Sequence, residues 1–122
     1  IVFRYRVQSE IRDAGDLELV VEDAQSFDIT VNGVTIHQRG ERQPSSPPGR
    51  PWFDAAFRRL PVAHAWRAGE NVIELAFRFS EDLALEQAYL LGSFALASAD
   101  GCEYVVTPEP TALRSGPWLS QI

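Results

Sequence analysis

Apolar and polar residues alternate along several short stretches of this chain, as in strands that have one buried face and one face in water. The stretches with this pattern are residues 3–7, 17–22, 27–31 and 71–79. Asn32-Gly33 follows the third stretch, and this dipeptide favours a two-residue hairpin turn because both residues tolerate a positive φ. Val34 then starts a returning strand, so we predict a run of antiparallel strands from Leu17 to Ile36.

The second half of the chain has further strand patterns and one short helical pattern. Residues 57–62 predict a strand, and Pro61 places it at a sheet edge because proline has no N–H to give to a ladder. Residues 64–67 predict one helical turn that ends before Gly69. Residues 89–96 are almost continuously apolar, which predicts a central strand buried on both faces. Weaker strand patterns cover residues 103–106 and 113–118.

Polar segments and breakers separate these patterns. Several glycines and prolines interrupt residues 38–50, so we expect a long exposed loop there. Residues 80–86 are typical of a short helix or a polar loop. Many short strands with turns between them predict an all-β fold, an antiparallel β-sandwich, in a single domain over residues 1–122. The chain lacks methionine and opens on a strand pattern, so we expect it to be a fragment of a longer multidomain chain.

Composition removes several classes of function. The 122 residues carry a net charge of −6, and an acidic chain with scattered arginines is a poor binder of the nucleic-acid backbone. No apolar run is long enough to cross a membrane, so we predict neither nucleic acid nor membrane as a partner. The single cysteine, Cys102, excludes an internal disulfide and a zinc site built on cysteines. The sequence does not indicate where the protein is localised.

Three segments, taken in order, resemble one group of domains. Residues 26–33 resemble the strand and turn of the sugar-binding-type sandwich of glycoside hydrolase family 2, and residues 69–75 resemble a strand entry of the same domains. Residues 88–94 resemble a strand of the galactose-binding-like jelly rolls in large bacterial glycosidases, including rhamnosidase-like enzymes, and residues 116–118 resemble the entry to their last strands. The resemblance implies a jelly roll beside a catalytic domain of the same chain.

The tryptophans are the residues with the clearest binding chemistry. Sugars present flat faces of C–H groups that pack on aromatic rings, while polar side chains bind their hydroxyls. All three tryptophans fall in or beside predicted loops, with three polar side chains at neighbouring loop ends. The alternative is that each tryptophan plugs an end of the sandwich or packs on a neighbouring domain. The candidate carbohydrate-binding residues are Trp52, Asp54, Trp66, Trp118, His37 and Arg50.

No organised catalytic site is visible in the sequence. Glycoside hydrolysis needs two carboxylates roughly 5–9.5 Å apart across the sugar. No motif pairs any of the acidic residues, and no ligand spacing surrounds His37 or His64, so we predict neither an enzyme nor a cofactor. A structural calcium ion suits this type of fold, but the sequence does not locate one. The candidate carboxylates are Asp28, Asp54, Glu74, Glu81, Asp82 and Glu86.

Two hypotheses of function follow from these patterns and stay open. In the first, the chain is a non-catalytic accessory module of a larger carbohydrate-active enzyme and contributes carbohydrate binding. In the second, it is a purely structural domain that positions a catalytic domain and has no ligand of its own. An independent enzyme comes third, and a hydrolysis assay of the chain on chromogenic glycosides would test it.

Overall fold

The computed structural model describes residues 1–12, 15–39, 47–78, 88–98 and 100–109. These residues form short strands and two single turns of 3₁₀ helix. The strands are β1 (Val2–Ser9), β2 (Glu18–Glu22), β3 (Asp28–Val31), β4 (Val34–His37), β5 (Arg50–Trp52), β6 (Asp54–Pro61), β7 (Gly69–Ala76), β8 (Tyr89–Leu91), β9 (Ala95–Ala97) and β10 (Val105–Thr107). The 3₁₀ turns are η1 (Ala24–Ser26) and η2 (Ala63–Ala65).

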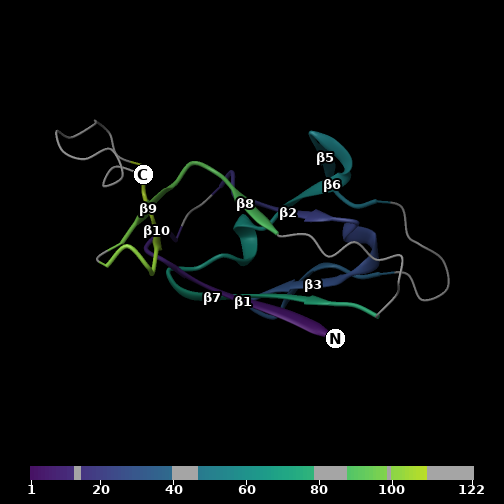
Figure 1. Ribbon diagram of the computed structural model, residues 1–122, viewed down its shortest axis with the longest axis horizontal. Helices are drawn as coiled ribbons and strands as arrows, with labels where there is room; N and C mark the ends of the chain where they lie inside the picture. The colour runs from purple at the N-terminus through teal and green to yellow at the C-terminus, as the bar shows by residue number, and fades with distance from the viewer. Residues whose placement is uncertain (13–14, 40–46, 79–87, 99, 110–122) are drawn as a thin grey trace.

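Within the described residues the strands form two sheets. One has six strands in the order β4-β3-β7-β1-β10-β9, and the other has four in the order β5-β6-β2-β8. Figure 1 shows them as two layers, with β9 and β10 at one end. The predicted all-β sandwich is therefore confirmed. The strands pair antiparallel, as predicted, except that β1 and β10 pair in parallel at Ser9 and Val106.

One hydrophobic core lies between the two sheets. Strands β2, β3 and β7 each direct alternate apolar side chains into it, as the alternation in the sequence predicted. Val7, which also belongs to an alternating stretch, is only partly buried against this core. The fully packed members are Leu17, Leu19, Val21, Ala24, Phe27, Ile29, Val31, Leu60, Val62, Ala65, Trp66, Ile73, Leu75 and Phe77.

The predicted turn at Asn32 and Gly33 is confirmed. Their φ angles are 52° and 78°, and Val31 pairs with Val34 across the turn. The strands on either side of η1 are also present, but they do not pair with each other. β2 belongs to the four-stranded sheet and β3 to the six-stranded sheet, because η1 carries the chain from one layer to the other.

The prediction of an edge strand at Pro61 is wrong. β6 extends from Asp54 to Pro61 and lies between β5 and β2. The sheet accommodates the proline because it is the last residue of β6, opposite Glu18 at the start of β2. The ladder then continues without it through a hydrogen bond of 3.1 Å from Val62 N–H to the Leu17 carbonyl.

The prediction of one central strand over residues 89–96 is also wrong. β8 forms an edge of the four-stranded sheet, and β9 forms an edge of the six-stranded sheet. Gly92 lies in the crossing between them, where an added Cβ would stand 3.1 Å from Leu17 Cδ1. The nearly continuous apolar segment therefore belongs to two strands in different sheets, and it does not form one buried strand. Both Tyr89 and Leu96 are exposed.

The other local predictions are confirmed in part. The helical turn is η2, which ends two residues before the expected position, and Trp66 is already extended. The strand expected at residues 103–106 is β10. Residues 80–86 and 113–118 lie outside the described residues, as does most of the predicted loop at residues 38–50.

Two amide side chains, the buried one of Asn71 and the partly buried one of Asn32, join the hairpin turn to the start of β7. Asn71 is fully buried, and its Oδ1 accepts hydrogen bonds from Asn32 Nδ2 at 2.8 Å and from Arg67 N–H at 2.9 Å. Its Nδ2 donates to the Arg67 carbonyl at 2.7 Å. Asn32 in turn donates to the Ala65 carbonyl and accepts from Val72 N–H. The two side chains supply hydrogen-bond partners for backbone groups of η2, of Arg67 and of β7.

We expect Asn71→Leu to lower the free energy of unfolding by about 2–4 kcal/mol, because leucine keeps the volume but leaves several polar groups without partners. Chemical denaturation monitored by circular dichroism measures this. Gln8→Leu is the matched control, since Gln8 is exposed and loses an amide of the same chemistry. A loss below about 0.5 kcal/mol for Asn71→Leu would show that the amide pair does not stabilise the fold.

Candidate functional site

The four-stranded sheet has a face directed away from the core, here called the outer face. In β2, Leu19 and Val21 point into the core, so the residues that alternate with them point outward. Cross-strand register extends this face to the neighbouring strands. Its members are Glu18, Val20, Glu22, Arg50, Trp52, Phe57, Arg59, Pro61, Tyr89 and Leu91.

Four aromatic side chains gather at one end of the outer face, here called the aromatic cluster. The Trp52 ring centroid lies 4.9 Å from that of Phe53, 6.3 Å from that of Phe57 and 5.4 Å from that of Tyr89. The Phe57 and Tyr89 rings are 6.4 Å apart. These residues come from β5, β6, β8 and the turn between β5 and β6, so strand pairing brings together rings that are distant in sequence.

Val20 shows how closely the side chains of the outer face pack. It points away from the core, yet its exposed fraction is 0%. Its cross-strand neighbours are Arg59 on one side and Tyr89 on the other. Directly opposed side chains in a sheet are in contact, so this face carries a small packed layer of its own.

Phe53 is the most unusual member of the aromatic cluster. It lies in the turn between β5 and β6, its φ is 56° and its side chain is 95% exposed. A left-handed conformation costs a non-glycine residue roughly 1–3 kcal/mol. An exposed aromatic ring held at that cost is a feature of surfaces that contact a ligand or a partner.

A charged group adjoins the aromatic cluster on the same face. Glu18 Oε1 lies 2.8 Å from Arg50 Nη2 and 2.6 Å from Arg59 Nη2. The Glu18 side chain is 12% exposed, whereas that of Arg50 is 64% exposed. Hydrogen bonds from Arg50 and then from Arg59 lower the pKa of Glu18. The pairing ties β5 and β6 to β2 and leaves part of the Arg50 guanidinium facing solvent.

The structure brings two of the six predicted binding residues together, Trp52 and Arg50. Trp66 lies in the core, where its Nε1 donates to Ser9 Oγ at 3.1 Å. His37 belongs to β4, at the far edge of the six-stranded sheet. Asp54 pairs with Trp52 across the turn, but its side chain and the whole of Trp118 lie outside the described residues.

The sequence did not single out five residues of this site, namely Phe53 in the turn and the four strand residues Glu18, Phe57, Arg59 and Tyr89. Phe57, Arg59 and Tyr89 fell within predicted strands, and Glu18 was assigned to the wet face of its strand. The alternation correctly indicates that Glu18 points away from the core. The alternation does not reveal which strands lie beside the strand of Glu18. The pairing of Glu18 with Arg50 and Arg59 therefore cannot be predicted from the local pattern.

Two of the candidate carboxylates, Asp28 and Glu74, pair with arginines at the surface. Asp28 accepts a hydrogen bond from Arg39 N–H at 2.9 Å, and Glu74 lies 3.4 Å from Arg4. The candidate carboxylates Glu81, Asp82 and Glu86 lie outside the described residues. Among the residues that are described, no three histidine, cysteine, aspartate or glutamate side chains group as a metal site would require. None of their helices has the length and apolar character to cross a membrane.

Comparison with known proteins adds no assignment. The chain matches no protein-family model, and neither the curated proteins nor the solved structures give a match.

The Glu18 pair predicts a specific dependence of stability on pH. A carboxyl whose folded pKa lies below its ordinary value of 4.5 stabilises the fold above that pH and loses this contribution as pH falls. The free energy of unfolding of the wild type should therefore exceed that of Glu18→Gln at pH 7, and the difference should shrink below about pH 4.5. Denaturant titrations from pH 7 to pH 3 measure it.

Glu10→Gln serves as the control for this experiment, because Glu10 is exposed and has no ion pair among the described residues. We expect it to change stability equally little at every pH. A difference between wild type and Glu18→Gln that stays constant from pH 7 to pH 3 would contradict the role given to the carboxylate.

Proposed function

We propose that this chain is a non-catalytic accessory module of a larger carbohydrate-active enzyme and that it binds carbohydrate on the outer face of its four-stranded sheet. The observation that carries the proposal is the position of the aromatic cluster beside the Glu18, Arg50 and Arg59 side chains. Aromatic rings offer the apolar faces that sugars stack on, and charged side chains offer directional hydrogen bonds to hydroxyls.

The path of the chain between layers supports a jelly roll as the finer fold. β1 lies in the six-stranded sheet, β2 in the four-stranded sheet, and β3 and β4 in the six-stranded sheet again. The chain continues to change sheet in the same way through β5 and β6, β7, β8, and finally β9 and β10. Repeated crossing between two facing sheets is typical of Greek-key and jelly-roll topologies.

The exposure of individual groups supports binding on this face. Phe53 and Tyr89 are exposed, and Arg50 keeps donors that its pairing with Glu18 does not use. The site lies on paired strands and on the turn between β5 and β6, and these elements hold the side chains of the site in fixed positions. The same apolar surface also suits the second hypothesis, in which it packs against a neighbouring catalytic domain and binds no sugar.

We expect Tyr89→Ala and Trp52→Ala each to weaken glycan binding by about tenfold or more, because each removes a stacking ring from the outer face. A glycan array with plant and bacterial oligosaccharides identifies a ligand, and calorimetric titration with that oligosaccharide measures the affinity. Tyr104→Ala is the matched control, since Tyr104 is an exposed tyrosine near β10 in the other sheet.

The experiment separates the hypotheses. Loss of binding in Tyr89→Ala and Trp52→Ala, with Tyr104→Ala unchanged, supports a sugar site on the outer face. If the folded chain binds no glycan on the array, the carbohydrate proposal fails and the structural hypothesis takes its place. Release of sugar from a chromogenic glycoside by the chain alone would overturn the non-catalytic assignment.

A further inference from the structure

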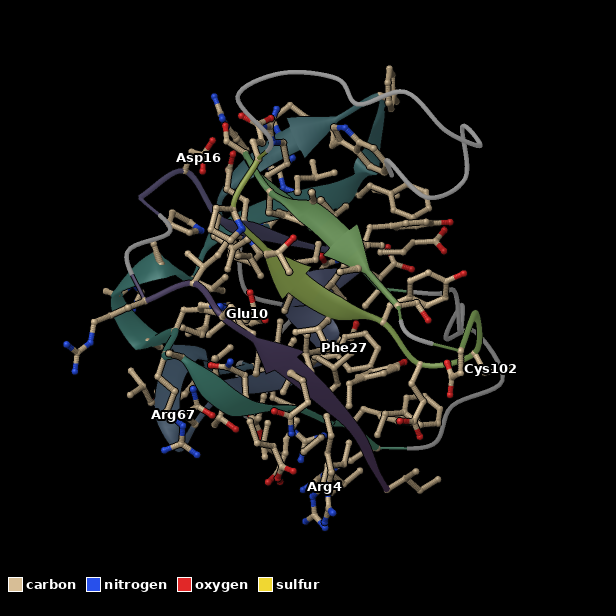
Figure 2. The ribbon with its side chains drawn as sticks, turned by 90° about the vertical axis from the view of Figure 1, so that its left-hand side faces the viewer. Arg4, Glu10, Asp16, Phe27, Arg67 and Cys102 are labelled. Carbon is tan, nitrogen blue, oxygen red and sulfur yellow. The ribbon has the colours of Figure 1, made fainter. Side chains whose placement is uncertain are left out.

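β1 is fully paired along one edge, and along most of the other edge the described residues provide it with no partner strand. Each of its eight residues pairs with β7, from Val2 with Ala76 to Ser9 with Gly69. On the opposite edge, the pairing among the described residues is limited to Ser9 with Val106 and a hydrogen bond of 2.7 Å from Glu10 N–H to the Val106 carbonyl. In Figure 2, β1 and β10 lie closest near Glu10 and separate toward Arg4.

An open edge of this length has a defined chemistry. In an antiparallel pair, alternate residues direct both N–H and C=O away from the partner strand. Along residues 2–8, those groups therefore form a row of donors and acceptors that another strand can pair with. Addition of an extended segment to such an edge is a recurrent mode of protein recognition.

The side chains on the core side of this edge are apolar and partly exposed. Phe3 is 37% exposed and Tyr5 is 38% exposed. Their partners in β7, Leu75 and Ile73, are buried, so exposure increases sharply from one strand to the next. An added strand would cover Phe3 and Tyr5 if its own residues on that side were apolar.

The side chains on the other side of the edge are basic. Arg4 lies 3.4 Å from Glu74 of β7 and is still largely exposed. Arg6 is exposed, and no hydrogen bond or ion pair engages its side chain within the described part of the chain. Opposite charges on directly facing strand positions stabilise a pair, and like charges destabilise it.

We propose that β1 is a docking edge for an extended strand of another polypeptide segment in which apolar and acidic residues alternate. The apolar residues would cover Phe3 and Tyr5, and the acidic residues would pair with Arg4 and Arg6. A second copy of this chain does not fit, because two antiparallel β1 strands centred on Tyr5 would place Arg4 of one copy beside Arg6 of the other. This inference does not depend on the proposed sugar site.

Titration with a synthetic peptide tests the proposal on the whole chain. The probe is a capped nine-residue peptide in which valine and glutamate alternate, and its comparison is the same peptide with lysine at every glutamate. We expect the acidic peptide to bind at least tenfold more tightly and to shift the amide resonances of residues 2–8. Hydrogen exchange should show alternate amides of β1 exchanging quickly in the free chain and slowly in the complex.

Arg6→Glu is the decisive variant and Arg12→Glu is its control, since both change one exposed arginine to glutamate and only the first lies in β1. Arg6→Glu should lose the preference for the acidic peptide, and Arg12→Glu should keep it. Absence of peptide binding, equal binding of both peptides, dimerisation through β1, or slow exchange of every β1 amide in the free chain would each overturn the proposal.

Discussion

The hydrogen-bonded pair of amides, Asn32 and Asn71, is the interaction on which the arrangement of the larger sheet depends. It fixes the β3–β4 turn, the end of η2 and the first residues of β7 relative to one another. β7 is the strand that β3 and β1 both pair with, so its start sets the register on either side. Such a hydrogen-bonded pair favours one arrangement because a shift of register would leave the polar groups of the buried Asn71 unsatisfied.

The outer face has a similar dependence on the register of β2. Glu18 and Val20 take their neighbours from β6 and β8, and a shift by one residue would turn both side chains toward the core. The core residues Leu19 and Val21 prevent that shift, because it would expose them. The same alternation that buries the core therefore positions the ionic group and the aromatic cluster on the opposite side of the sheet.

Local chemistry made part of this fold predictable. The Asn32-Gly33 turn and the buried faces of β2, β3 and β7 follow from residues that are adjacent or two apart. Assignment of strands to sheets does not, because pairing joins distant residues, as the division of residues 89–96 between β8 and β9 shows. Trp52 and Arg50 were predictable as candidates for the site, whereas Glu18 and Tyr89 reach them through register alone.

The β1–β7 pairing also constrains the order of events in folding. Ser9 pairs with Gly69 and Val2 with Ala76, so the partners are 60 to 74 positions apart in the sequence. At roughly 5–20 residues per second, a ribosome makes β7 about 3–15 s after the matching part of β1. Contacts of such long range also slow the closure of a β-sandwich. Until β7 has been made and has paired with β1, Phe3 and Tyr5 have no partner strand. Arg4 and Arg6 alternate with these apolar residues, and charges in such positions oppose aggregation.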